Sequence, residues 1–452
     1  MHRTAFSLLA GISLLGVSMS ASASTDVELL RNEVAQLKDE VARLRGATGD
    51  NWLTEQRAGE IRSLVQDVLA DADTRASLLG SGMSAGYDNG FFLASADNNF
   101  RLKIGGRVQF RYVYNYQSSP GLTGDRHRSG FENRRTRLNF EGHIVNPSWV
   151  YQVQGDFAAA GGGFTALDVW AGYKFDNGMM VRAGQFRPGF MFEDSTSSAR
   201  QLAVERSLVN ARFAQGRTQG VELSGAIGDN VRWSGMYSEG FRSTTSLTPG
   251  TFNNTNWAAR TTEFAFSGRV EALLSGNWRQ FREFTSWSGE SFAMMIGAGI
   301  MYQQDEFGTV ANAFEAEVLR WTVDATFKFG GANAFIAFVG NHESMHGGGG
   351  NVSQWGLVAQ GGFFIVPDDI ELFGRFEWSD ADTTGVKDLA VITVGVNKYF
   401  SKHAVKWTTD VGYGINEVDP FWGSRGAGAG WRSDAAGDKG QIVIRSQLQL
   451  VF

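Results

Sequence analysis

The stretch RLKIGGRVQFRYVYNYQ, residues 101–117, decides the fold class. Every second residue from Leu102 to Tyr116 is apolar, aromatic or glycine. The other alternate set, which starts at Arg101, includes the cations Arg101, Lys103, Arg107 and Arg111. Because successive side chains lie on opposite faces of a β-strand, the segment is predicted to be a strand with one apolar and one cationic face. The fold class depends on what each face contacts.

Composition narrows the class of protein. The 452 residues include 57 Gly, 34 Phe and 13 Trp but only 6 Pro, which is unusual for a soluble enzyme of this size. The formal net charge of -6 argues against a nucleic-acid partner, although it does not describe local patches. The chain has no Cys, which excludes disulfides, thiolate metal sites and cysteine nucleophiles.

The first 23 residues have the pattern of a secretory signal peptide. Arg3 precedes a short apolar run, and the small residues Ala21, Ser22 and Ala23 follow it, which predicts cleavage after Ala23. An uncleaved membrane anchor is the alternative, but the apolar run is short for a membrane span. No other stretch approaches about 18 uninterrupted apolar residues, so no spanning helix is predicted.

Residues 24–90 are predicted to form a helical coiled coil followed by a glycine-containing linker at about 80–90. The apolar seam at heptad positions a and d consists of Val27, Leu30, Val34, Leu37, Val41 and Leu44. Glu33 and Lys38 stand five residues apart with opposite charge, as in pairs that join neighbouring chains. A single solvated helix is the alternative, because fewer than three heptads are marginal alone.

Residues 91–452 show a period of two almost throughout, with sixteen candidate strands. Their centres are Val108, Leu138, Val153, Val169, Val181, Leu223, Trp233, Phe266, Ile296, Val323, Ile336, Leu357, Phe373, Val394, Val411 and Leu448. Short links begin near Val145, Asp176, Gly228, Gly330, Val366 and Ser401, and they alternate with long polar loops. The segment 275–290 is a long link where a short one is expected.

This alternation predicts an all-β transmembrane barrel of about 16 antiparallel strands in an outer membrane, with short turns on the periplasmic side. An even number of strands places both ends of the barrel on that side, so the coiled coil is expected in the periplasm. The apolar face of residues 102–116 then contacts lipid, with its tyrosines at one interface. The cationic face contacts a water-filled lumen.

The lumen-facing cations of the first two strands are the candidate anion pathway. They are Lys103, Arg107, Arg111, Arg135 and Arg137. Inward-facing arginines and lysines are one means by which pores select anions. The alternative is that they pair with inward carboxylates, for which Glu141, Asp156 and Asp168 are candidates by the same alternation.

No catalytic residue, metal site or cofactor is predicted. Residues 342–346 spell His-Glu-Ser-Met-His, the spacing of a helical zinc site, but they precede a glycine run and are expected at the polar tip of a long outer loop. The glycine-rich segment near Gly426 is interpreted as another outer loop. No Ser, His and Asp arrangement suggests a hydrolase, so the chain is not expected to be an enzyme.

The segment VRAGQFRPGFMFEDSTSSARQLAVERSLVN, residues 181–210, resembles the signature of the phosphate-selective porin O and P family. The resemblance lies in GQFRP at 184–188, Glu193, TSS at 196–198 and ERS at 205–207. It implies a sixteen-stranded trimeric porin whose third long loop folds into the channel. The constriction loop is then residues 187–216, with Arg187, Arg200, Arg206 and Arg212.

These observations predict an outer-membrane porin that forms a passive diffusion channel for small anionic solutes, with phosphate as a candidate. The expected partners are outer-membrane lipid, two further copies in a homotrimer, and the cell wall through the coiled coil. Valine at heptad position a with leucine at d favours a coiled coil of two helices instead. The expectation of a trimer therefore rests on the family resemblance of the barrel. The alternative function is a general or weakly selective porin that acts mainly as an envelope tether.

Overall fold

The computed structural model describes residues 34–40, 42–43, 59, 63, 65–66, 83–88, 90–119, 125–158, 162–241, 262–309, 312–346 and 350–452. The chain divides into two units, Met1–Gly82 and Met83–Phe452. In the first unit, residues 34–40 and 42–43 are helical, as the heptad pattern predicts for them. The predicted signal peptide and the rest of the predicted coiled-coil seam lie outside the described residues. Among the described residues, no helix has the length and apolar character that a membrane span needs.

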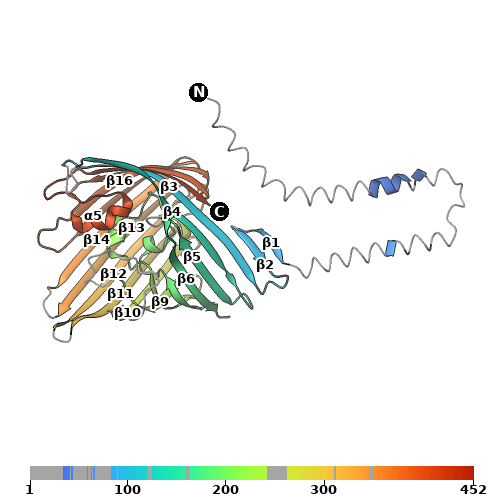
Figure 1. Ribbon diagram of the computed structural model, residues 1–452, viewed down its shortest axis with the longest axis horizontal. Helices are drawn as coiled ribbons and strands as arrows, with labels where there is room; N and C mark the ends of the chain where they lie inside the picture. Colours follow the sequence, from blue (N-terminus) through green and yellow to red (C-terminus); the bar gives the residue numbers. More distant parts are fainter. Residues whose placement is uncertain are drawn as a thin grey trace, which may run out of the picture. The chain divides into compact units, whose positions relative to one another are not determined.

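The second unit contains a closed antiparallel barrel (Figure 1). Its strands are β3 (Arg101–Tyr116), β4 (His127–His143), β5 (Trp149–Asp156), β6 (Thr165–Lys174), β7 (Met180–Phe186), β8 (Thr218–Ile227), β9 (Val231–Ser238), β10 (Thr262–Ser275), β11 (Ala293–Thr309), β12 (Asn312–Lys328), β13 (Ala332–His346), β14 (Val352–Val366), β15 (Ile370–Asp380), β16 (Leu389–Ser401), β17 (Val405–Gly414) and β18 (Ile442–Val451). Each strand pairs with the next, and β18 closes the ring on β3. Each predicted strand centre lies in one of these sixteen strands, which confirms the predicted number.

A hairpin of two short strands extends the sheet at the foot of β3. It consists of β1 (Ser84–Tyr87) and β2 (Phe91–Ala94). β2 pairs with residues 101–104 of β3, whereas β18 pairs with residues 107–116. The sequence analysis assigned residues 80–90 to a linker, and β1 corrects this. Its sequence, SAGY, is too short and too small in side chain to show an alternating pattern.

Side chains alternate between a polar interior and an apolar exterior, as the opening segment predicts. In β3, Gln109 and Arg111 are 0% and 1% exposed, whereas Phe110 between them is 43% exposed. The same holds in β12, where Arg320 is buried and Leu319 is exposed. The apolar exterior is the surface that lipid can cover, and the ladder between strands supplies the hydrogen bonds that hydrocarbon cannot.

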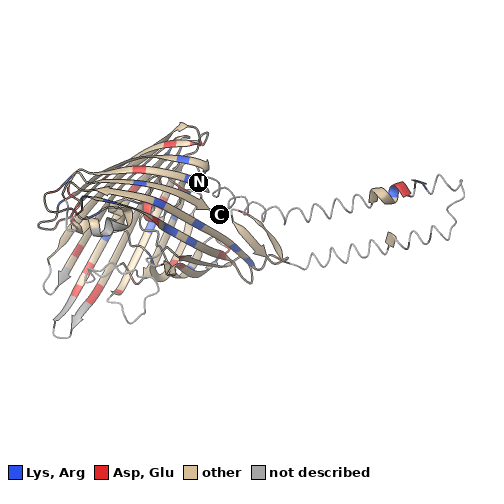
Figure 2. Ribbon diagram, turned by 45° about the horizontal axis from the view of Figure 1, so that its top comes forward, with Lys and Arg blue, Asp and Glu red and all other residues tan. Residues whose placement is uncertain are grey.

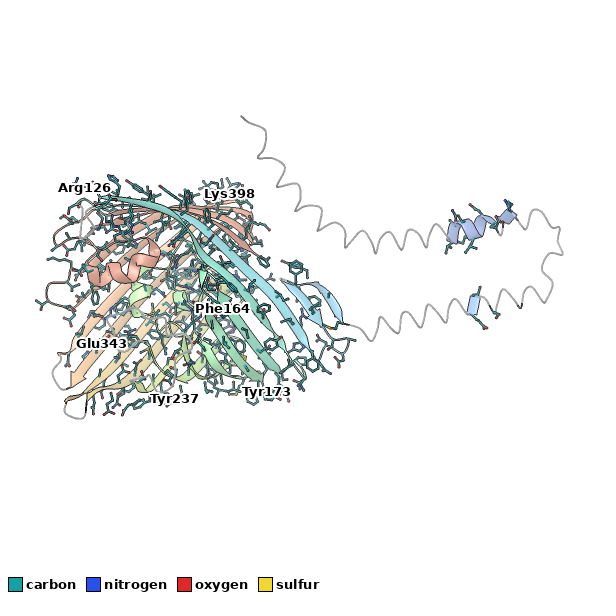
Figure 3. All side chains as sticks on the ribbon, in the orientation of Figure 1. Arg126, Phe164, Tyr173, Tyr237, Glu343 and Lys398 are labelled. Carbon is teal, nitrogen blue, oxygen red and sulfur yellow. The ribbon has the colours of Figure 1, made fainter. Side chains whose placement is uncertain are left out.

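The HESMH segment is not the loop tip that the sequence analysis expected. Residues 342–346 are the last part of β13. Glu343 (Figure 3) is buried beside Arg320, whereas His342 is exposed and contacts Ser353 Oγ at 2.8 Å. Because a strand puts neighbouring side chains on opposite faces, Glu343 lies on the face opposite His342. The helical face that the zinc motif requires is therefore not formed.

The long link that broke the alternation folds into the barrel. We call residues 276–292, between β10 and β11, the inward turn; it includes the 3-10 helix η4 (Gln280–Arg282). The Phe284 ring lies 5.1 Å from the ring of Phe335 on β13, centroid to centroid. Lys328 Nζ, at the end of β12, donates to the carbonyl oxygens of Glu283, Phe284 and Thr285 at 2.6, 2.7 and 2.9 Å. A fully buried ammonium therefore anchors the inward turn.

Replacing this anchor should loosen the inward turn. Lys328→Met leaves three carbonyl oxygens without their donor, and hydrogen bonds to a charged group contribute about 2 kcal/mol. We expect amide hydrogen exchange at residues 280–290 to rise roughly 30-fold. Lys398→Met is the matched control, because that lysine (Figure 3) is 39% exposed and forms an ion pair with Asp369, which is 37% exposed. Equal exchange in both variants would contradict the anchor.

Candidate functional site

The constriction loop, residues 187–216, lies inside the barrel, against the strands from β15 to β17. It carries two short helices, α3 (Phe192–Ser195) and α4 (Leu208–Phe213). The backbone N–H of Val204 donates to Asp410 Oδ2 at 2.9 Å. Lys406 Nζ donates to the Gln201 carbonyl at 2.9 Å, and Arg375 Nη1 donates to the Glu205 carbonyl at 2.8 Å. Inward side chains of the barrel wall thus hold the backbone of the loop.

Glu205 is the centre of a buried charge cluster that joins this loop to β3 and β4. Its carboxylate accepts hydrogen bonds from Arg111 Nη1 at 2.8 Å, Arg134 Nε at 2.6 Å and Arg135 Nη2 at 2.7 Å. Adjacent residues of a regular strand point to opposite faces. Arg134 and Arg135 both reach Glu205 because the β3–β4 register shifts between Gln109 and Phe110. The bulge therefore brings a third arginine into the cluster.

The charge state of Glu205 follows from two opposing effects. Burial raises the pKa of its carboxyl, but the charges of Arg134, Arg135 and Arg111 more than offset it and hold the pKa well below its usual range. Glu205 is therefore ionised at neutral pH. Arg111 and Arg135 both form ion pairs with this carboxylate. Two of the five predicted pathway residues therefore serve to fix the constriction loop.

Three other predicted residues have partners elsewhere in the barrel. Lys103 Nζ is 3.7 Å from Glu141 Oε1, a pairing that the sequence analysis left open. Arg200 lies beside the inward turn, where its carbonyl accepts the N–H of Phe284 at 3.2 Å. Arg212 Nη2 donates to Gln354 Oε1 at 2.6 Å, on the side of β14.

A cavity of about 210 Å³ lies between the constriction loop and the wall of strands β3 to β7. Six of its lining residues are arginines: Arg107, Arg137, Arg182, Arg187, Arg206 and Arg217. It is also lined by Gln152, Gln154, Asp168, Trp170, Phe186, Asp194, Ser195, Ser197 and Ser198. The structure therefore brings four of the predicted cations together, Arg107, Arg137, Arg187 and Arg206.

Sequence analysis missed Arg182 and Arg217. Arg182 follows the alternation of β7, in which Val181 and Ala183 flank it, so the same argument used for the first two strands could have found it. Arg217 directly precedes β8 and lies outside any strand pattern. Its Nε and Nη2 atoms donate to both carboxylate oxygens of Asp168 on β6, at 3.0 and 2.8 Å. Only the fold brings Arg217 next to Asp168.

Four of the six arginines are paired with acids. The pairs are Arg217 with Asp168, Arg137 with Asp156, Arg187 with Asp194, and Arg182 with Glu222. The alternative of cations neutralised by inward carboxylates thus holds for these four. Cations and carboxylates also occur together on the barrel strands as a whole (Figure 2).

Arg107 and Arg206 differ from the other four. Among the described residues, no carboxylate lies within 4.0 Å of either guanidinium. Arg107 Nη1 donates to Ser198 Oγ, and Arg206 donates to the carbonyl oxygens of Glu193, Asp194 and Thr196 at 2.9, 3.2 and 2.6 Å. Burial lowers the pKa of Arg206 to about 10, which leaves it charged at neutral pH. Six arginines against four acids give the site a formal excess of two positive charges.

A closed sixteen-stranded barrel with an apolar exterior, a charged interior and an inward-folded loop defines an outer-membrane porin, a channel that catalyses no reaction. The family model described as phosphate-selective porin O and P matches residues 102–411, well over half of the chain. The chain belongs to this family, as the signature in residues 181–210 predicts. No curated protein matches the sequence significantly.

Solved structures share the fold. An anion-selective porin from Comamonas acidovorans is 13% identical with a TM-score of 0.52, over 78% of this chain and 99% of its own. OmpF of Salmonella typhi is 12% identical with a TM-score of 0.51, over 82% and 100%. The outer membrane channel DcaP of Acinetobacter baumannii is 12% identical with a TM-score of 0.50, over 78% and 98%. At such identity the likeness concerns the barrel fold.

Removing the charge of Glu205 should release the constriction loop. Glu205→Gln leaves three arginines without their buried carboxylate, and breaking a buried ion pair costs about 3 kcal/mol or more. We expect roughly 100-fold faster amide exchange at residues 192–213 and noisier single-channel current. Glu132→Gln is the control, since that acid pairs with Arg111 but is 47% exposed. If residues 192–213 exchanged in Glu205→Gln at the same rate as in the wild-type protein, this role would be contradicted.

The same cluster predicts a pH dependence. A carboxyl whose pKa is lowered in the folded state stabilises it fully above the usual pKa of Glu, near 4.3. That stability is lost as the pH falls through the lower folded pKa of Glu205. The protection factors of the wild-type loop, which correct for the intrinsic pH dependence of amide exchange, should therefore stay constant from pH 5 to 8 and fall only below about pH 4.

Proposed function

We propose that this porin is a passive diffusion channel for small anions, with inorganic phosphate as one candidate solute. The carrying observation is the excess of positive charge at the constriction, which Arg107 and Arg206 supply. The name of the family and the description of the Comamonas acidovorans porin as anion-selective support the proposal.

The proposed mechanism is electrostatic and requires no conformational change. Charges that line a narrow, low-dielectric path are screened less than surface charges, so an excess of two can act although the whole chain is acidic. Guanidinium groups present planar pairs of N–H donors that match carboxylate and phosphate oxygens. The hydroxyl of Ser197, which also lines the cavity, can replace water around the anion.

The paired acids set the strength of this attraction. Conduction requires that an ion enter a site readily and also leave it. Asp168 and Asp194 lie in the cavity wall and neutralise Arg217 and Arg187. We propose that they keep the site from trapping anions, while the arginines that they bind remain available as hydrogen-bond donors.

Charge reversal at the constriction tests the anion channel. The intact protein in a planar bilayer should give an anion-selective reversal potential in a salt gradient. Arg107→Glu changes the formal excess from two to zero and should remove most of that selectivity. Arg101→Glu is the control, because Arg101 pairs with Asp88 at the foot of β3. Cation preference in the intact protein would refute the proposal.

We also propose that the barrel associates as a homotrimer through β5 to β9. β5 has 8 residues, β7 has 7 and β9 has 8, whereas β11 and β12 have 17 each. A seven-residue strand tilted by about 45° spans only ~16 Å, less than the apolar band of about 25 Å. Neighbouring copies can cover this short wall better than lipid. Its exposed residues include Val169, Val221 and Leu223.

The proposal extends to the first unit. An exported chain cleaved after Ala23 would place the coiled coil of residues 27–44 in the periplasm, where it would help to join three copies. Attachment to the cell wall through this helix is the alternative role, in which the barrel acts as a weakly selective porin and anchor. The reversal potential above separates the two roles, because a tether requires no anion selectivity.

A charge on the short wall should dissociate the assembly. Leu223→Arg places a cation in the proposed interface and should convert trimers to monomers in native mass measurements. Val270→Arg on β10 is the matched control, since Val270 is also apolar and exposed but lies on the long wall. An arginine that faces lipid at the midplane costs about 2–4 kcal/mol. Dissociation of both, or of neither, would refute this interface.

A further inference from the structure

The constriction also has a planar aromatic side that the arginine cluster does not explain. Trp170 on β6 is half-buried and lines the cavity. Its Nε1 atom donates to Gln152 Oε1 on β5 at 2.9 Å, which holds the indole ring in one orientation. A fixed, partly open indole face inside a polar channel is therefore available to a passing solute.

Arg182 and Phe186 of β7 extend this side of the cavity. The guanidinium carbon of Arg182 lies 3.9 Å from the centre of the Phe186 ring and 5.4 Å from that of Trp170. Phe186 is 1% exposed, so it supports Arg182 from behind. Arg182 Nε donates to Glu222 Oε1 at 2.8 Å, which neutralises its charge and fixes its plane. We call Trp170, Arg182 and Phe186 the aromatic platform.

The cavity therefore has two chemically different parts. Arg107 and Arg206, the two cations without an acid partner, come from β3 and the constriction loop. The aromatic platform comes from β6 and β7, and its only cation is paired. A ligand that uses both parts needs an anionic group and, attached to it, a flat apolar body.

We propose that the constriction binds planar organic anions, in particular aromatic carboxylates, better than non-planar anions of equal charge, and that Trp170 determines this preference. The inference rests on the proposed anion channel and names a solute class for the same site. Inorganic phosphate has no planar face and would contact only the guanidinium and hydroxyl groups. The cavity of about 210 Å³ exceeds the ~150 Å³ that holds a benzene molecule in a buried site.

Stacking accounts for the expected size of the effect. Offset or edge contacts between aromatic rings contribute beyond the area they bury, by an amount that corresponds to roughly 2- to 10-fold in affinity. Benzoate and cyclohexanecarboxylate carry the same charge and have similar size, but only benzoate is planar. Comparing these two anions isolates the contribution of a flat face.

The test measures the block of chloride current through single channels of the full-length protein, with benzoate, cyclohexanecarboxylate and inorganic phosphate as separate probes. Benzoate should bind roughly 2- to 10-fold more tightly than cyclohexanecarboxylate. Trp170→Leu keeps an apolar side chain but removes the ring, and it should abolish this difference while leaving block by phosphate unchanged. Tyr173→Leu is the control; Tyr173 (Figure 3) is on the same strand but packs against Trp149 and Phe175 and does not line the cavity.

The outcomes separate this inference from the function on which it rests. Anion-selective current with equal block by benzoate and cyclohexanecarboxylate would overturn the planar preference and leave the anion channel standing. A difference that survives Trp170→Leu would overturn the role of Trp170. Changed block by phosphate in Trp170→Leu would show that the substitution disturbs the arginine cluster, and would equally count against a separate aromatic platform.

Discussion

The rest of the structure depends on one constraint: inside hydrocarbon, every backbone N–H and C=O must find a partner within the protein. A sheet satisfies this only if it closes, and here β18 returns to β3 to complete the ring. Closure forces each strand to present one row of side chains to lipid and the other to the lumen. The period of two in residues 101–117 reflects this division into two rows. Charged side chains can occupy the row that faces the lumen.

A closed ring of sixteen strands encloses more space than wall side chains fill, so the chain uses two inserted segments. The constriction loop packs against β15 to β17, and the inward turn is held by Lys328 at the end of β12. The two segments meet where Phe192 and Phe284 lie 5.5 Å apart, centroid to centroid. Buried charges, with Glu205 foremost, attach them because the lumen wall is polar. The arginine cavity lies where the constriction loop faces β3 to β7.

Local alternation made the barrel predictable, and its limits explain the errors. Sixteen strand centres could be placed because each strand shows one apolar face. The β1–β2 hairpin was not predicted because a strand of four residues is too short to show a clear alternation. The end of β13 was not predicted because polar residues on both faces of a strand resemble a loop. The position of an inward residue in a strand predicts that it faces the lumen. Whether it lines the pore depends on the bulge at Arg134 in β4 and on the path of the inserted loop, which only the fold sets.

The same limit shows why counting inward cations does not give selectivity. Arg111 and Arg135 face inward as predicted, yet both are used to hold Glu205. Arg182 and Arg217 line the cavity, but each forms an ion pair with a carboxylate, Glu222 and Asp168 respectively. What distinguishes Arg107 and Arg206 is their partners: a hydroxyl and three carbonyls orient the guanidinium groups without neutralising them. Neutral acceptors that fix a cation leave its charge directed at the path. In the proposed anion channel, Arg107 and Arg206 therefore supply the net positive charge, and the arginines that pair with acids shape the site around them.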